Sequence, residues 1–235
     1  RMRRLKTAYP PHTIIDPTVI IGDMRLHKTP DEVELMQKAA TISAEAHILA
    51  MKKTKPGMNE FQVESLIEAY MREQGASGVA YNSIIGGGDN ATILHYVENN
   101  RLLKDGDLLL IDAGAEYQGY AADITRTFPI NGNFTPAQRE VYDIVLDVQE
   151  KCIDYTKTGN TVKGRQEYSI ELLTEGMKKL GLLKGKTEDL IKKKAYMKYY
   201  MHGVGHYLGM DVHDAGRYFT DQTAKNSRPF APGMV

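Results

Sequence analysis

One segment, with two aspartates on opposite arms of a hairpin, constrains this chain more than any other feature. It reads LLLIDAGAEYQGYAADITRTF, in which an apolar run leads into Asp112 and the chain returns through Asp123 after a polar turn. If the loop is Tyr117-Gln118, the aspartates are directly opposite; if it is Gln118-Gly119, they are diagonal neighbours two residues out of register. In either case they share one face, with β-carbons about 5–8 Å apart.

The two aspartates need a compensating partner, because like charges on one sheet face are destabilising without a cation, a shared proton or solvent. Asp112 ends the apolar run LLLI, which argues against free solvation. Thr125 or Arg126 is close enough in sequence to bond Asp123 instead. A bound divalent cation explains the pair better, and it requires further ligands from elsewhere in the chain.

A glycine-rich segment, MHGVGHYLGMDVHD, offers such ligands in His202, His206 and His213. The i, i+4 spacing of the first two would suit a zinc-protease helix, but the glycines disfavour a helix and the Glu of an HExxH motif is absent. We therefore expect a looped or extended segment that presents several imidazoles. Another imidazole, His95, follows a glycine-rich stretch without a phosphate-loop signature, and residues 86–90 are predicted to form a hairpin turn.

Carboxylates and imidazoles in this combination favour a metal site. Carboxylate oxygens with one imidazole suit Mn²⁺ or Co²⁺, with Zn²⁺ as a further candidate. Two carboxylates on one face can bridge two metals, and such a pair can hold a hydroxide and polarise a carbonyl. The remaining histidines would then bind substrate or carry protons.

Composition restricts the class of protein. Lys and Arg total 30 and are balanced by 30 Asp and Glu, so bulk charge gives no case for nucleic acid or an anionic membrane. No apolar run reaches the roughly 18 residues that a transmembrane helix needs, and no signal peptide follows the basic start. The single cysteine, Cys152, lies on the apolar stripe of a predicted helix and is interpreted as a packed thiol. We expect a cytoplasmic globular protein without nucleic-acid or membrane partners.

The two halves of the chain repeat a similar order of elements. Capping-box signals at Thr29 and Asn59 open two predicted helices in the first half. A third signal at Thr135 opens a helix in the second half, and a helix containing EYSIELLTEGMKKLG follows it. Strand-like segments occupy residues 79–130 between these pairs, which suggests a duplicated α+β unit. Residues 9–22 are predicted to form an extended lead-in.

Three segments resemble, in order, the Xaa-Pro aminopeptidases (aminopeptidase P) of the pita-bread metallopeptidase family. They are YNSIIGGGDNATILHYVENN, LLLIDAGAEYQGYAADITRTFPINGNFTPAQREVYDIVL and MHGVGHYLGMDVHDAG. The resemblance runs from about Met24 to Val235. It implies an α+β pita-bread fold, in which a pseudo-two-fold duplicated unit packs helices outside a curved, mainly antiparallel sheet. It also implies that residues 1–23 are the exit segment of a missing N-terminal domain, and that residues 24–235 are a C-terminally incomplete catalytic domain.

The resemblance implies a metal centre with two divalent ions, Mn²⁺ foremost and Co²⁺ or Zn²⁺ as alternatives. Asp112 would chelate one ion, Asp123 would bridge both, and His206 would bind the other. The implied reaction removes the N-terminal residue from a peptide whose second residue is proline, by attack of a hydroxide that bridges the metals. Family members have two further glutamate ligands, expected after Val235. We therefore expect the chain alone to bind metal weakly and to show little activity.

The resemblance also implies roles for the remaining candidates. His95 and His213 would contact substrate and stabilise or shuttle charge, and His202 would line the pocket for proline, which makes these three the expected catalytic residues. Tyr81 would lie near the substrate entrance and bind substrate together with the histidines. The implied partners are peptides with proline at the second position, and the full-length protein is expected to be a homo-oligomer.

Other interpretations stay open. A prolidase cleaves Xaa-Pro dipeptides at the same metal site and differs mainly in how its pocket treats chain beyond proline. A metal-free pita-bread protein acting as a binding module, or a creatinase-like hydrolase, would have lost metal ligands, whereas Asp112, Asp123 and His206 are all present. A methionine aminopeptidase fits the motifs less well than the proline-specific group does.

Overall fold

The computed structural model describes residues 2–9, 17–221 and 223–235. Its helices are α1 (Met2–Ala8), α2 (Thr18–Leu26), α3 (Pro30–Lys53), α4 (Glu60–Glu73), α5 (Pro136–Tyr155), α6 (Val162–Lys179) and α7 (Thr187–Lys192), with 3₁₀ turns η1 (Gly88–Thr92) and η2 (Ala195–Lys198). Its strands are β1 (Gly78–Val79), β2 (Ile84–Gly87), β3 (Leu108–Ala113), β4 (Ala115–Tyr117), β5 (Tyr120–Ala121) and β6 (Ile124–Pro129). All strand pairs are antiparallel and form two sheets, β1-β4-β5 and β2-β3-β6. The fold is α+β, as predicted.

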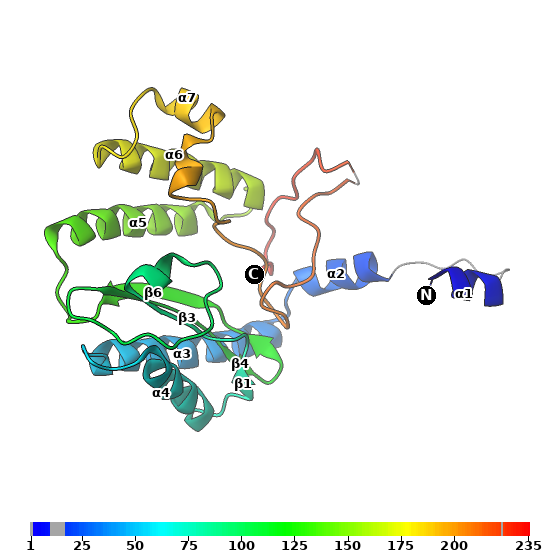
Figure 1. Cartoon of the computed structure of the whole chain (residues 1–235). Helices are drawn as coiled ribbons and strands as arrows, with labels where there is room; N and C mark the ends of the chain where they lie inside the picture. The colour runs from blue at the N-terminus through cyan, green and yellow to red at the C-terminus, as the bar shows by residue number, and fades with distance from the viewer. Residues whose placement is uncertain (1, 10–16, 222) are drawn as a thin grey trace.

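Two helix pairs lie on opposite sides of β3 and β6 (Figure 1). α3 and α4 pack on one side, and α5 and α6 pair with each other on the other side. The predicted repeat is visible in these pairs, and the capping boxes predicted at Thr29, Asn59 and Thr135 are all present. The named strands all fall within residues 78–129, so the second helix pair has no sheet of its own in the described part of the chain.

The N-terminal lead-in was predicted wrongly, because residues 18–22 belong to α2. Their β-branched run disfavours a helix weakly. Packing overrides that preference: Leu26 at the end of α2 is fully buried against Tyr207 and Phe230 from the far end of the chain. Residues 10–16 of the expected lead-in lie outside the described residues. α2 also crosses the predicted boundary between residues 23 and 24, and the division into domains stays a prediction.

The hairpin turns at Gln118 and Gly119, the second of the two loops considered. Their φ angles of 49° and 83° are left-handed, as in the type I′ turns that join short hairpins. In this register Asp112 pairs with Thr125 across β3 and β6, which makes Asp123 its diagonal neighbour. The two aspartates therefore lie on one side of the hairpin, as the alternation of the strands requires.

The glycine-rich stretch at residues 86–90 is not the predicted hairpin turn. It ends β2 and enters the turn η1, and its glycines permit close backbone packing: a Cβ on Gly86 would lie 2.9 Å from the backbone of Ala91. The segment folds around a fully buried acid, Glu60, which accepts hydrogen bonds from Gly87 N–H at 2.7 Å and from the Tyr96 hydroxyl at 2.7 Å. A buried acceptor therefore shapes the loop that carries His95, which local turn rules cannot anticipate.

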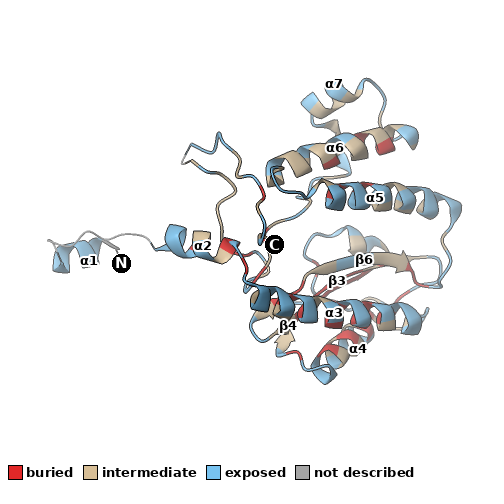
Figure 2. Ribbon diagram, turned by 180° about the vertical axis from the view of Figure 1, so that it is seen from behind, coloured by how far each residue is buried: buried red, intermediate tan, exposed pale blue. Residues whose placement is uncertain are grey.

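The core is concentrated where α3 and α4 meet the sheets, whereas α5 and α6 are mostly exposed or half-buried (Figure 2). Cys152 of α5 is buried, as predicted. A groove of about 660 Å³ separates β6 from α5 and α6, and its lining includes Val141, Val145 and Leu173. No helix in the described ranges is long and apolar enough to cross a membrane.

Gly114 joins β3 to β4 at a point where the two hairpin arms approach each other closely. A Cβ at this position would overlap the carbonyl group of Ala122. We expect Gly114→Ala to lower the free energy of unfolding by about 3 kcal/mol, since backbone atoms cannot yield as a side chain would. Urea unfolding measures this loss.

The control is Gly78→Ala, because a Cβ on Gly78 meets no atom within 4 Å. We expect it to change the free energy of unfolding by less than about 0.5 kcal/mol. Equal unfolding midpoints for the two variants would show that the close approach of Gly114 to Ala122 does not require glycine.

Candidate metal centre

Asp112 and Asp123 converge on one hydroxyl. Asp112 lies near the end of β3, and Asp123 lies in the break between β5 and β6. Tyr81, just after β1, is hydrogen bonded through its hydroxyl to Oδ1 of Asp112 and to Oδ1 of Asp123, the latter at 3.0 Å. A tyrosine hydroxyl carries one proton and donates to one carboxylate at a time. The pair is therefore only partly compensated.

Burial and charge act differently on these three groups. Burial, followed by the charge of Asp123, raises the pKa of Asp112. Burial also raises the pKa of Tyr81, and the two carboxylates raise it further, so the hydroxyl stays protonated. For Asp123, burial acts upward, but the hydrogen bonds from His206 and Tyr81 outweigh it and lower the pKa. Asp123 is the more firmly ionised of the two acids.

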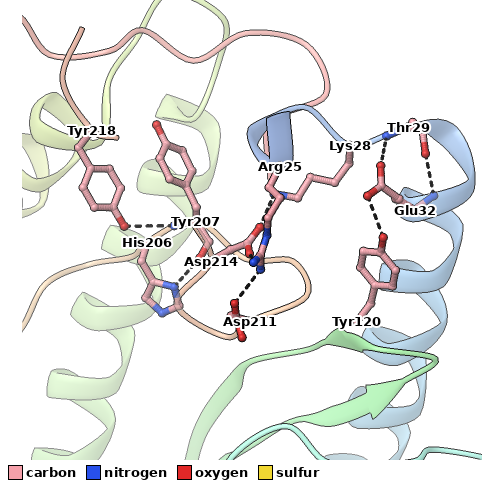
Figure 3. A network of polar contacts seen from close by, with 10 residues as sticks. All are labelled: Arg25, Lys28, Thr29, Glu32, Tyr120, His206, Tyr207, Asp211, Asp214 and Tyr218. Carbon is pink, nitrogen blue, oxygen red and sulfur yellow. Dashed lines mark hydrogen bonds and ion pairs between the residues drawn. The ribbon is translucent and has the colours of Figure 1, made fainter. Parts of the chain in front are cut away.

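His206 supplies a positive counter-charge from the second half of the chain. Its Nε2 lies 3.2 Å from Oδ2 of Asp123, and each side chain is 25% exposed. Its Nδ1 lies 2.9 Å from the carbonyl oxygen of Tyr207 (Figure 3). The hydrogen bond to Asp123 raises the pKa of His206 despite burial. An acceptor beside each nitrogen favours the protonated imidazole, and Nε2 points at the carboxylate.

The remaining histidines complete two pairs. His213 stacks on His206 with ring centroids 4.0 Å apart and planes inclined by 25°. Burial lowers the pKa of His213, and the charge of His206 lowers it further. His95 and His202 meet edge to face at 6.0 Å and are both exposed. The segment that carries the last three histidines is irregular rather than helical, as predicted.

The donor set suits a divalent ion in chemical type, because it combines carboxylate oxygens with an imidazole nitrogen. The described residues contain no group of three His, Cys, Asp or Glu side chains that already form a cage. The group between the two carboxylates is the Tyr81 hydroxyl. An ion bound by both carboxylates would displace this hydroxyl.

Two kinds of supporting residue were not predicted. Thr125 is hydrogen bonded to the carboxylate of Asp112, whereas the sequence suggested it only as a partner of Asp123. The hairpin loop determines which of the two aspartates lies opposite Thr125, and the loop at Gln118 and Gly119 places Asp112 there. Asp214 follows His213 and forms a buried ion pair with Lys28. No local pattern marks that pair, because its members are 186 residues apart.

Comparison with known proteins agrees with this geometry. A model of metallopeptidase family M24 matches residues 34–235. The chain is 46% identical to the Xaa-Pro aminopeptidase of Escherichia coli (strain K12) over 225 residues, which cover 96% of this chain and 50% of the relative. It is 48% identical to the Xaa-Pro aminopeptidase of Haemophilus influenzae over 209 residues, which cover 89% of this chain and 49% of the relative. The chain spans about half the length of the curated relatives it matches.

A solved structure shows the same arrangement of elements. It is that of aminopeptidase P from E. coli with the inhibitor Pro-Leu, which superposes with a TM-score of 0.89 at 45% identity and covers 94% of this chain and 49% of that chain. The family model covers most of the chain and includes every candidate residue of the site. The chain therefore belongs to metallopeptidase family M24.

Proposed function

We propose that this chain forms the metal-binding part of an aminopeptidase that removes the N-terminal residue from peptides with proline in second place. The observation that carries the proposal is the convergence of Asp112, Asp123 and His206 beside one another in a member of family M24. The curated relatives named above are Xaa-Pro aminopeptidases. The inhibitor Pro-Leu of the E. coli structure begins with proline, as would the product of this cleavage.

Asp123 has the orientation that a bridging ligand needs. Its Oδ1 faces Tyr81 and Asp112, whereas its Oδ2 faces His206. The two oxygens therefore face different neighbours, and Asp123 would be shared by two divalent ions that Asp112 and His206 would also help to hold. Mn²⁺ is the proposed ion, with Co²⁺ or Zn²⁺ as alternatives. Bound ions of this kind polarise a peptide carbonyl and make water nucleophilic near neutral pH.

The other side chains would handle substrate and protons. Burial and the neighbouring charge of His206 favour neutral His213, which can donate a hydrogen bond to the carbonyl under attack or accept a proton. His95 and His202 are exposed beside each other and would contact the peptide near the proline. The Tyr81 hydroxyl stays protonated and would serve as a donor at the substrate entrance.

Metal stoichiometry tests the assignment of Asp123. In the gene product at its natural length, we expect Asp123→Asn to lose the dinuclear site, because the amide supplies one neutral oxygen in place of two charged ones. Titration with MnCl₂, followed by electron paramagnetic resonance of the free ion, measures the number of sites. Asp143→Asn is the control, because that acid is exposed on α5 and pairs with Arg139. Unchanged stoichiometry in Asp123→Asn would show that it is not a bridge.

Substrate length separates the aminopeptidase from a prolidase. With Mn²⁺ present, the gene product at its natural length should cleave an Xaa-Pro-Pro tripeptide faster than an Xaa-Pro dipeptide. Release of the N-terminal residue is followed by chromatography. The opposite preference would identify a prolidase. No turnover together with no bound Mn²⁺, Co²⁺ or Zn²⁺ would indicate a binding module.

The position of the Tyr81 hydroxyl predicts that removing it costs more stability without metal than with metal. In EDTA, Tyr81→Phe should lower the free energy of unfolding by about 2 kcal/mol, because buried carboxylates lose a charge-assisted donor. In MnCl₂ the loss should shrink, since bound ions take over that compensation. Tyr70→Phe is the control, because its hydroxyl meets only Glu45 at an exposed site. An equal loss for Tyr81→Phe in both conditions would refute the displacement of the hydroxyl.

A further inference from the structure

A buried ion pair ties the start of α3 to the histidine segment (Figure 3). Nζ of Lys28 donates to Oδ2 of Asp214 at 2.9 Å, and these side chains are only 2% and 1% exposed. The guanidinium of Arg25 binds the other oxygen of Asp214 and also reaches Asp211 at 2.7 Å. Arg25 and Lys28, near the junction of α2 and α3, thus both form ion pairs with Asp214, which directly follows His213.

The backbone of Asp214 connects this pair to the ring of His206. The N–H of Asp214 donates to the carbonyl oxygen of Tyr207 at 2.9 Å. The same oxygen accepts from Nδ1 of His206, also at 2.9 Å. A shared acceptor fixes the ring so that Nε2 faces Asp123. An anchored Asp214 therefore restrains the imidazole of His206. It also restrains His213, which directly precedes Asp214 in the sequence and stacks on His206.

Gly209 extends the same cluster to the carboxylate side of the site. A Cβ on Gly209 would overlap the carboxylate of Asp214 and lie 3.0 Å from Cε of Lys28, so only glycine allows this approach. The carbonyl oxygen of Gly209 accepts from Ala121 N–H in β5 at 2.8 Å. Asp123 follows Ala121 by two residues. The ion pair is thus packed against the loop that pairs with the strand leading to Asp123.

The first turn of α3 also holds β5 directly. Glu32 accepts from the backbone N–H of Thr29 at 2.7 Å as part of the capping box and from the Tyr120 hydroxyl at 2.8 Å (Figure 3). Residues 28–32 therefore contact both halves of the candidate site: the β5 arm through Glu32 and the histidine segment through Lys28.

We propose that Lys28 and Asp214 are positioning residues, which hold His206 and His213 in register with Asp123 across the two halves of the chain. Burying two charges has a desolvation cost that their attraction only partly offsets, so stability alone is a weak reason for such a pair. Because the pair contacts Gly209 and Asp214 shares an acceptor with His206, we infer that the pair orients the histidine segment. The inference rests on the proposed function, because the groups it positions are the proposed ligands of metal and substrate.

The test compares Lys28→Met with a conservative variant, Lys28→Arg, and with Asp23→Asn. Asp23 is the matched control, because it also joins α2 to the C-terminal segment, accepting from Arg217 at 2.7 Å and Arg228 at 2.9 Å. Two quantities are measured on the gene product at its natural length. They are the amide hydrogen exchange of residues 206–214 without metal, and the affinity for MnCl₂ by electron paramagnetic resonance.

We expect Lys28→Met to speed exchange in residues 206–214 by about tenfold, because this segment loses an anchor while the core does not. Mn²⁺ affinity should fall by about tenfold, as for other residues that orient a ligand. Lys28→Arg should recover most of both losses, and Asp23→Asn should leave both readouts near wild type. Wild-type exchange in Lys28→Met, or an equal rise in Asp23→Asn, would overturn the proposal.

A double variant covers the case in which Lys28→Met leaves a buried acid unpaired and unfolds the chain. Lys28→Met with Asp214→Leu removes both charges, which can preserve folding. The proposal expects this folded double variant to keep fast exchange and weak Mn²⁺ binding, whereas wild-type behaviour would overturn it. If the gene product at its natural length binds no Mn²⁺, the proposed function fails, and the exchange readout still decides whether the pair positions the histidines.

Discussion

The repulsion between two carboxylates on one side of the hairpin is the constraint on which the arrangement of the surrounding residues depends. The antiparallel register brings Asp112 and Asp123 together, Gly114 lets the two arms approach closely, and both acids share the Tyr81 hydroxyl. One tyrosine proton cannot neutralise two acids. His206, about 80 residues further along the chain, places its Nε2 beside Asp123, and the contact of its Nδ1 with the carbonyl oxygen of Tyr207 orients the ring.

The two halves of the site depend on one another through the start of α3. Its capping box, which also orders the helix, supplies an acceptor for β5, and the preceding Lys28 anchors the histidine segment. The helix pairs differ in what they cover: α3 and α4 pack on strands, and α5 and α6 lie on the other side of β3 and β6 (Figure 1). An apolar groove separates α5 and α6 from β6. The histidine segment is held by polar contacts and by the packing of its Tyr207 against Leu26 and Phe230.

Features that depend on neighbouring residues were predictable, and features that depend on distant ones were not. Capping boxes at Thr29 and Asn59 and the face shared by the two aspartates follow from spacing alone. The helix at residues 18–26 was missed because packing of Leu26 outweighs the preference of its β-branched residues. The turn at residues 86–90 was missed because a buried acid on α4 organises that loop. The Lys28–Asp214 pair joins positions with no common local pattern.

The central claim is that Asp112, Asp123 and His206 form one metal-binding constellation in which Asp123 serves two positions. Anomalous X-ray diffraction from crystals of the gene product at its natural length, grown with MnCl₂, tests it most directly. We expect Mn²⁺ peaks within coordination distance of these side chains, and a Tyr81 hydroxyl that no longer lies between the two carboxylates. Peaks elsewhere, with that hydroxyl still bonded to both acids, would contradict it.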